Sequence, residues 1–162
     1  MAEVLNEVLG KGKEFEYLIA TRDPAFEDLL ICIELVKQFI IDHNLIVYGG
    51  AAIDYALRLK GDKIYPDDLL KVPDFDFYSP ENTEHAYSLA DIIYDKGYPD
   101  ARAIAGMHIG TMRVDVTANH FIADITYKPR EIFDKLPYLV YNGIRIIHPM
   151  FQRIDVHSSL CF

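Results

Sequence analysis

The chain has 162 residues, of which 51% are hydrophobic and 25% charged, and this composition excludes a disordered protein. The net charge of −9 argues against a surface that binds nucleic acid on its own, because such surfaces are usually basic. Neither a membrane span nor a secretory signal is expected, since charged residues interrupt the most apolar stretch, 29–59, and the chain start lacks a basic segment followed by an apolar run.

Residues 1–22 have mixed polarity and are expected to form a lead-in to one domain that spans 23–162. Asp23-Pro24 is typical of a helix start, with an acidic N-cap and a proline at the first helical position. The helix is predicted to end at His43-Asn44, and its apolar face is expected to consist of Phe26, Leu29, Leu30, Ile33, Val36, Phe39 and Ile40. Cys32 lies in this helix and is interpreted as the buried free thiol of a reduced, intracellular protein; the second cysteine is Cys161.

The middle of the chain is predicted to alternate between strands and helices. Residues 45–48 form a short apolar strand that ends at Gly49-Gly50, residues 51–59 a helix, and residues 62–73 a polar loop with two prolines. Residues 74–78 alternate strictly between polar and apolar and predict a strand. Residues 83–96 predict a helix that ends before Gly97.

The last part of the chain is predicted to be mostly β-structure. Strands are expected at 101–108, 111–116 and 121–127, followed by a short helix at 130–135 and a hairpin of 138–141 and 144–147 around Asn142-Gly143. The order predicts an α+β fold with a mixed β-sheet flanked by helices. The apolar end of the chain, 158–162, has no polar tail, and we interpret it as the end of a fragment that is truncated within this domain.

A glycine pair, Gly49-Gly50, is the first of three features that suggest chemistry. Glycines between a strand and a helix let backbone N–H groups approach an anion, and the helix N-terminus adds favourable electrostatics. The surrounding residues do not form a phosphate-binding P-loop motif. A tight structural turn explains the pair equally well when it is taken alone.

The second feature is Asp74-Phe75-Asp76-Phe77. Residues i and i+2 of a strand point to the same face, so the aspartates are expected to project together while the phenylalanines enter the core. Two carboxylates about 7 Å apart along a strand can straddle two divalent ions separated by roughly 4 Å. An exposed strand face that is merely acidic fits the same alternation, so the motif alone leaves both interpretations open.

The third feature is Asp124, a lone acid in an apolar strand. A carboxylate in that position is costly unless it is paired or coordinates a metal ion. Asp115 is the competing candidate, but Arg113 shares its face and is expected to pair with it. We therefore predict Asp124 as the third metal ligand and keep Asp115 as the alternative.

Together these features resemble the polymerase-β-like nucleotidyltransferase superfamily, which has a strand, a glycine pair, a helix, Asp-x-Asp on a strand and a third aspartate on a later strand. Longer segments are similar to the poly(A) polymerase catalytic subunits of poxviruses, asfarviruses and giant viruses. These segments are 47–57 (VYGGAAIDYAL), 73–80 (PDFDFYSP), 111–114 (TMRV), 123–127 (ADITY) and 146–149 (IIHP). The similarity runs from about Phe26 to the end of the chain.

The resemblance implies transfer of AMP from ATP to an RNA 3′ end, with release of pyrophosphate. It implies that Asp74 and Asp76 hold two Mg²⁺ or Mn²⁺ ions and that Asp124 completes the site of the ion that activates the 3′-hydroxyl. It also implies that Gly49 and Gly50 contact the triphosphate. The implied partners are ATP and RNA, with a second copy of the chain or a processivity subunit left open, and the implied location is the virion or the cytoplasm of an infected host cell.

Two departures from the family pattern limit what carries over. The gap between Gly50 and Asp74 is longer than in many superfamily members, so residues 61–72 are expected to form an extra loop. Family enzymes are also considerably longer, so the surfaces that hold adenine and RNA are expected outside this chain or on a partner. Two other functions stay open: a nucleotidyltransferase with a small-molecule or protein acceptor, and a non-catalytic nucleotide-binding or subunit-interaction module.

Overall fold

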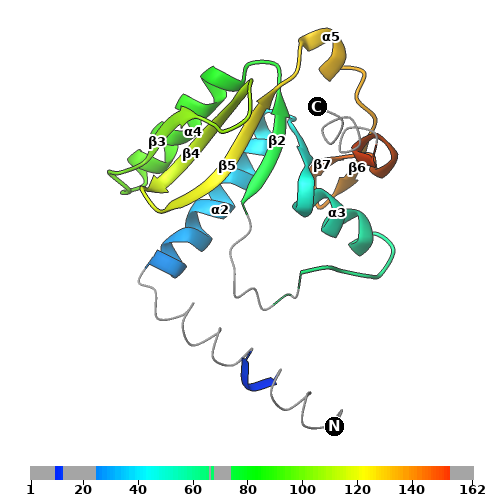
Figure 1. Cartoon of the computed structure of the whole chain (residues 1–162), viewed down its shortest axis with the longest axis horizontal. Helices are drawn as coiled ribbons and strands as arrows, with labels where there is room; N and C mark the ends of the chain where they lie inside the picture. Colours follow the sequence, from blue (N-terminus) through cyan, green and yellow to red (C-terminus); the bar gives the residue numbers. More distant parts are fainter. Residues whose placement is uncertain (1–9, 13–24, 66, 68–73, 154–162) are drawn as a thin grey trace.

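The computed structural model of the chain describes residues 10–12, 25–65, 67 and 74–153. The helices are α2 (Ala25–Asp42), α3 (Gly49–Arg58), α4 (Asn82–Asp95) and α5 (Arg130–Phe133) (Figure 1). The strands are β1 (Ile46–Tyr48), β2 (Phe75–Ser79), β3 (Arg102–Ala105), β4 (Thr111–Thr117), β5 (His120–Tyr127), β6 (Tyr138–Tyr141) and β7 (Ile144–Ile147). Most of the predicted lead-in, the predicted helix start at Asp23-Pro24, Cys161 and the chain end at 158–162 lie outside the described residues.

Seven strands form one mixed sheet in the order β3-β4-β5-β2-β1-β7-β6. Strand β2 is parallel to β5 and antiparallel to β1, and β1 is parallel to β7. The other neighbours, β3 with β4, β4 with β5 and β6 with β7, are antiparallel. Three segments that are far apart in the sequence, β1, β2 and β5, thus lie side by side at the centre of the sheet.

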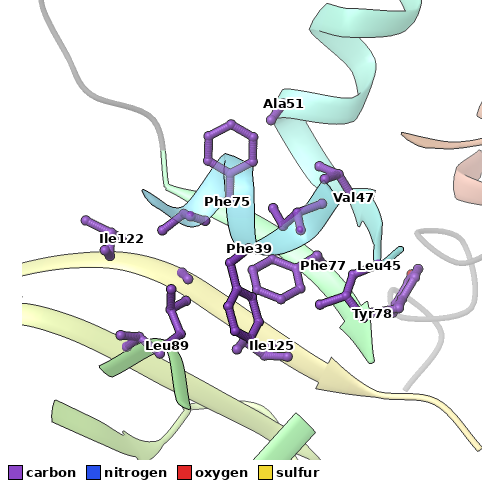
Figure 2. Packing of buried hydrophobic residues seen from close by; sticks show 14 of the residues in the cluster. Phe39, Leu45, Val47, Ala51, Phe75, Phe77, Tyr78, Leu89, Ile122 and Ile125 are labelled. Carbon is purple, nitrogen blue, oxygen red and sulfur yellow. The ribbon is translucent and has the colours of Figure 1, made fainter. Parts of the chain in front are cut away.

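One hydrophobic core packs the helices against this sheet. Figure 2 shows side chains of α2, β1, α3, β2, α4 and β5 meeting in a single cluster. Phe75 and Phe77 belong to it and are 1% and 0% exposed, so the prediction that they face the core is confirmed. Cys32 is also fully buried and free, as predicted, and burial, with a smaller contribution from the charge of Asp28, raises the pKa of its thiol to about 11.

The predicted elements are all present, but some details differ. The second predicted helix begins at Gly49 rather than Ala51, so the glycine pair is its first turn. Leu30 is 40% exposed, so its assignment to the apolar face of α2 is wrong, whereas its neighbour Leu29 packs against the core. No helix in the described part of the chain has the length and apolarity that crossing a membrane requires.

Candidate active site

Asp76 and Asp124 occupy equivalent positions on neighbouring strands. The parallel register of β2 and β5 pairs Asp76 with Asp124, so both side chains leave the same face of the sheet next to each other. The side chains of Phe75 and Phe77 lie on the opposite face of β2 and are buried in the hydrophobic core. The central strands therefore present two adjacent carboxylates that come from segments almost fifty residues apart.

The carboxyl group of Asp76 lies in a partly buried environment with excess negative charge. Burial and the charges of Asp74, just before β2, and Asp124 raise the pKa of Asp76 to about 7, while Arg113 acts in the opposite direction. A carboxyl group in these surroundings gains stability from a proton or from a cation. This is the electrostatic condition that a metal-binding carboxylate cluster creates.

Gly49 and Gly50 bring the N-terminus of α3 against this cluster. Gly49 has a φ of +74°, in the region that favours glycine, and a Cβ at this position would lie 2.6 Å from Oδ2 of Asp76. A Cβ on Gly50 would lie 2.6 Å from the hydroxyl oxygen of Tyr65. The helix end, whose first N–H groups lack intrahelical partners and attract anions, is therefore adjacent to the carboxylate of Asp76.

The ion pairs of β4 differ from those expected from the sequence. Nε and Nη2 of Arg113 donate to the two carboxylate oxygens of Asp124 at 2.8 and 2.7 Å. Asp115 instead accepts from Nε of Arg102 at 3.1 Å. The expectation that Arg113 pairs with Asp115 is therefore wrong, and Asp124, which was expected to be a lone acid in its strand, is the partner of Arg113.

The strand registers explain these pairs. Arg113 lies directly opposite Asp124 on β5, and Asp115 directly opposite Arg102 on β3. Residues that face each other across antiparallel strands are about 5 Å apart, whereas residues i and i+2 along one strand are about 7 Å apart. The cross-strand partner is therefore closer than the partner on the same strand.

Hydroxyl and aromatic groups lie beside the carboxylates. The hydroxyl of Tyr48 is hydrogen-bonded to Oγ1 of Thr126 at 2.8 Å, and that atom to Oγ1 of Thr111 at 2.8 Å. The rings of Tyr48 and Tyr78 stack with centroids 4.2 Å apart. Thr126 and Tyr78 are two residues beyond Asp124 and Asp76, so the strand alternation would have placed them on this face from the sequence alone.

Asp54 is a further buried carboxylate that the sequence motifs did not single out. It is 3% exposed and accepts hydrogen bonds from Nε of Arg58 at 2.6 Å and from the backbone N–H groups of Ile64 and Tyr65 at 2.8 Å each. Burial alone would raise the pKa of Asp54, but these hydrogen bonds hold it below its usual value. Asp54 thus fixes the described part of the loop after α3 to the helix. This places the hydroxyl group of Tyr65 next to Gly50.

The three predicted ligands suit a divalent ion in their chemistry. Carboxylate oxygens are the donors that Mg²⁺ and Mn²⁺ prefer, and the raised pKa of Asp76 reflects a need for positive charge. Among the described residues, however, no three acidic, histidine or cysteine side chains converge as a complete ion site. Both oxygens of Asp124 are engaged by Arg113 in this arrangement.

Comparisons with known proteins identify the relatives of this chain. A protein of African swine fever virus, described as a proposed poly(A) polymerase catalytic subunit, is 43% identical over 149 residues, which are 92% of this chain and 31% of that protein. Its counterpart in Acanthamoeba polyphaga mimivirus is 32% identical over 133 residues, 82% of this chain and 23% of that protein. The chain thus spans at most 31% of the length of these relatives.

The fold and the family model agree with these relatives. The crystal structure of the Megavirus polyadenylate synthase matches 95% of this chain, and 31% of its own, with a TM-score of 0.85 at 28% identity. This match confirms the predicted α+β nucleotidyltransferase core. The model of the family "Poly(A) polymerase catalytic subunit" matches residues 34–162, a range that contains the glycine pair and all three aspartates. The chain therefore belongs to the family of poly(A) polymerase catalytic subunits.

Proposed function

We propose that this chain is the nucleotide- and metal-binding part of an enzyme that transfers AMP from ATP to the 3′ end of RNA. One observation carries the proposal: Asp76 lies between Asp124, its neighbour in register, and the helix N-terminus at Gly49. Carboxylates for divalent ions are thus adjacent to a helix end that attracts phosphate. The similarity to poly(A) polymerase catalytic subunits supports ATP and RNA as substrates.

The residues have distinct roles in this proposal. Asp74 and Asp76 would hold two Mg²⁺ or Mn²⁺ ions, and Asp124 would complete the site of the ion that activates the RNA 3′-hydroxyl. When bound, the ions stabilise the attacking and leaving oxygens of an in-line displacement at phosphorus. The backbone N–H groups of Gly49 and Gly50 bind the triphosphate and orient its α-phosphorus toward the carboxylates.

The bonds that change are those of a nucleotidyl transfer. The 3′-hydroxyl oxygen of RNA bonds to the α-phosphorus of ATP. The bond from that phosphorus to the oxygen that bridges the α- and β-phosphates breaks, and this oxygen leaves as a terminal oxygen of pyrophosphate. The proton of the hydroxyl passes to solvent. Repetition of this step lengthens the RNA by one adenylate at a time.

The acidic charge and the length of the chain constrain its partners. A net charge of −9 leaves little basic surface for RNA. Because the chain spans less than a third of its relatives, we place the surfaces that bind RNA and adenine in the remaining length of such proteins or on a partner subunit. The relatives are viral proteins, so we place the activity inside an infected cell.

Extension of a short oligo(A) primer tests this function. The chain is incubated with each NTP in turn and with Mg²⁺ or Mn²⁺, beside Asp76→Asn and, as a matched control, Asp115→Asn. Asp115 is a buried, paired carboxylate one strand away from Asp124, so its loss perturbs the sheet without removing a proposed ligand. Where the chain extends the primer, the ladder is expected to be specific for ATP, to disappear in Asp76→Asn and to persist in Asp115→Asn.

Other outcomes separate the alternative functions. Labelling of a protein or small molecule from ATP, without labelling of RNA, would favour the alternative acceptor. Metal-dependent ATP binding without any transfer would favour a nucleotide-binding module that needs further segments for catalysis. Absence of both transfer and ATP binding would contradict the proposal.

A further inference from the structure

The three predicted ligands are accompanied by one guanidinium group, that of Arg113. It contacts both oxygens of Asp124, and its carbon Cζ lies 4.1 Å from the centre of the Phe121 ring. The side chains of Arg113 and Asp124 are 24% and 13% exposed, so the pair is shielded from most of the solvent. Bidentate charge-assisted pairs of this kind are strong and fixed in geometry.

This pair determines the charge balance of the cluster. Asp74, Asp76 and Asp124 contribute three carboxyl groups, and the guanidinium group of Arg113, which is bound to Asp124, lowers the pKa of Asp76. Loss of the guanidinium would leave a partly buried cluster of like charges without compensation. The cost of burying unpaired charge is large.

We propose that Arg113 is the resident counter-ion of the metal-free site and that it releases Asp124 when a divalent ion enters. This inference rests on the proposed metal-dependent function. An ion that is bound to Asp124 while Arg113 still holds both oxygens would place two cations on one carboxylate, where they repel each other. The ion therefore replaces the guanidinium, and Arg113 competes with it for the same oxygens.

Two consequences distinguish this role from a purely structural one. Removal of Arg113 tightens binding of a divalent ion, because the competing cation is gone. It also destabilises the metal-free protein, because the cluster loses its counter-ion, and the added ion restores that stability. A structural ion pair would lose stability on mutation without any gain in ion affinity.

The chain contains a matched control for this comparison. Arg102 on β3 pairs with the buried Asp115 of β4, one strand further from the cluster and in the same sheet. The contact involves a single oxygen, Oδ2, at 3.1 Å. Arg102→Gln therefore breaks a second arginine–aspartate pair of the same sheet, in which the arginine side chain is 51% exposed, without touching a predicted ligand.

The test is a titration with Mn²⁺, followed by the paramagnetic resonance signal of the free ion, together with thermal unfolding with and without Mn²⁺. Arg113→Gln is expected to bind Mn²⁺ about tenfold more tightly than the wild type, which corresponds to about 1.4 kcal/mol. It should unfold at a lower temperature without Mn²⁺ and gain more from its addition. Arg102→Gln should lose stability but keep the Mn²⁺ affinity of the wild type.

The other outcomes are informative in different ways. If Arg113→Gln binds Mn²⁺ no more tightly than the wild type, the proposed replacement of Arg113 by the ion on Asp124 is contradicted, but the proposed metal site is not. If neither the wild type nor any variant binds Mn²⁺, the proposed function fails at the metal site. If Arg113→Gln does not fold, Arg113→Lys decides, because a single ammonium cannot hold both oxygens. This variant should also bind Mn²⁺ more tightly, by a smaller factor, and unchanged binding would overturn the proposed replacement.

Discussion

Asp76 on β2 and Asp124 on β5 are paired in register across two parallel strands, so their carboxylates project side by side from one face of the sheet. This placement depends on a strand order that joins the middle of the chain to a segment almost fifty residues later. The repulsion between the two groups is part of what raises the pKa of Asp76 to about 7, after burial and Asp74. The site is therefore least stable when it is ionised and without a cation.

This electrostatic cost predicts a pH dependence for the metal-free protein. Asp76 keeps its proton up to about pH 7 in the folded state, but releases it near the usual pKa of 3.8 in the unfolded state. Protonated Asp76 therefore contributes fully to the stability of the folded state below about pH 3.8. This contribution is lost as the pH rises from there toward about 7. Asp76→Asn removes this contribution, so the difference in unfolding free energy between the variant and the wild type should shift in favour of the variant as the pH rises.

Urea unfolding of both proteins in the presence of a chelator, at about pH 5 and about pH 8, measures this difference. The comparison cancels the titration of the other carboxyl groups, which the two proteins share. A difference that does not change between the two pH values would contradict the burial and charge environment assigned to Asp76.

The two glycines should respond differently to substitution by alanine. Gly49→Ala places a Cβ 2.6 Å from the Asp76 carboxylate in a backbone conformation with φ +74°, which by itself costs about 1–2 kcal/mol for an L-residue. Gly50→Ala meets only the hydroxyl end of Tyr65, which can move. Gly49→Ala should therefore lose more stability and also weaken Mn²⁺ binding, because Asp76 is displaced.

Thermal unfolding and Mn²⁺ titration of both alanine variants check this order. Gly50→Ala serves as the control for a changed helix start, and it should keep the Mn²⁺ affinity of the wild type. Equal losses of Mn²⁺ affinity in the two variants would mean that the contact of Gly49 with Asp76 has no special part in the site.

The anchor of the loop after α3 gives a further prediction. Asp54→Ala removes a buried carboxylate that is bound by Arg58 and by two backbone N–H groups, and it should destabilise the protein by about 3 kcal/mol or more. Asp67→Ala removes an exposed partner of Arg58 and should cost much less. Chemical unfolding of the two variants at neutral pH measures the difference, and similar losses would contradict the role of Asp54 as the anchor.

The lowered pKa of Asp54 also predicts how its contribution to stability depends on pH. Its folded-state pKa lies below the usual value, so the stability it contributes is present above that value and is lost as the pH falls through the folded-state pKa. The wild type should therefore lose its advantage over Asp54→Asn on acidification. An advantage that persists in acid would show that the ionised form of Asp54 does not hold the loop.

Local sequence patterns were sufficient to predict the elements, but the site also depends on pairing between strands. Asn142 and Gly143 have φ values of 47° and 82°, the positive values that the asparagine–glycine pair indicates, and β6 and β7 have the predicted bounds. The adjacency of β2 to β5, in contrast, depends on contacts between distant segments, which no local pattern encodes. Local patterns therefore predict Asp76 and Asp124 as separate candidates, and only the family resemblance implies that they share one site.

The pairing of Arg113 with Asp124 can be predicted from the sequence alone. The predicted connection between β4 and β5 pairs Thr117 with His120, and counting back along both strands from this pair places Arg113 opposite Asp124. The i, i+2 spacing along β4 alone predicts Asp115 as the partner instead. The i, i+4 spacing of Asp54 and Arg58 on α3 was a similar unused signal, whereas the hydrogen bonds of Asp54 to the loop required the path of the backbone.

The most direct test of the account is equilibrium binding of ATP in the presence of Mn²⁺ to the wild type, Asp76→Asn and Asp115→Asn. Loss of a metal ligand should weaken binding by at least about tenfold, as even outer-shell changes at metal sites do. We predict this loss for Asp76→Asn and unchanged binding for Asp115→Asn, whose carboxylate is paired with Arg102. Equal ATP affinities of the wild type and Asp76→Asn would contradict a metal and nucleotide site at these aspartates.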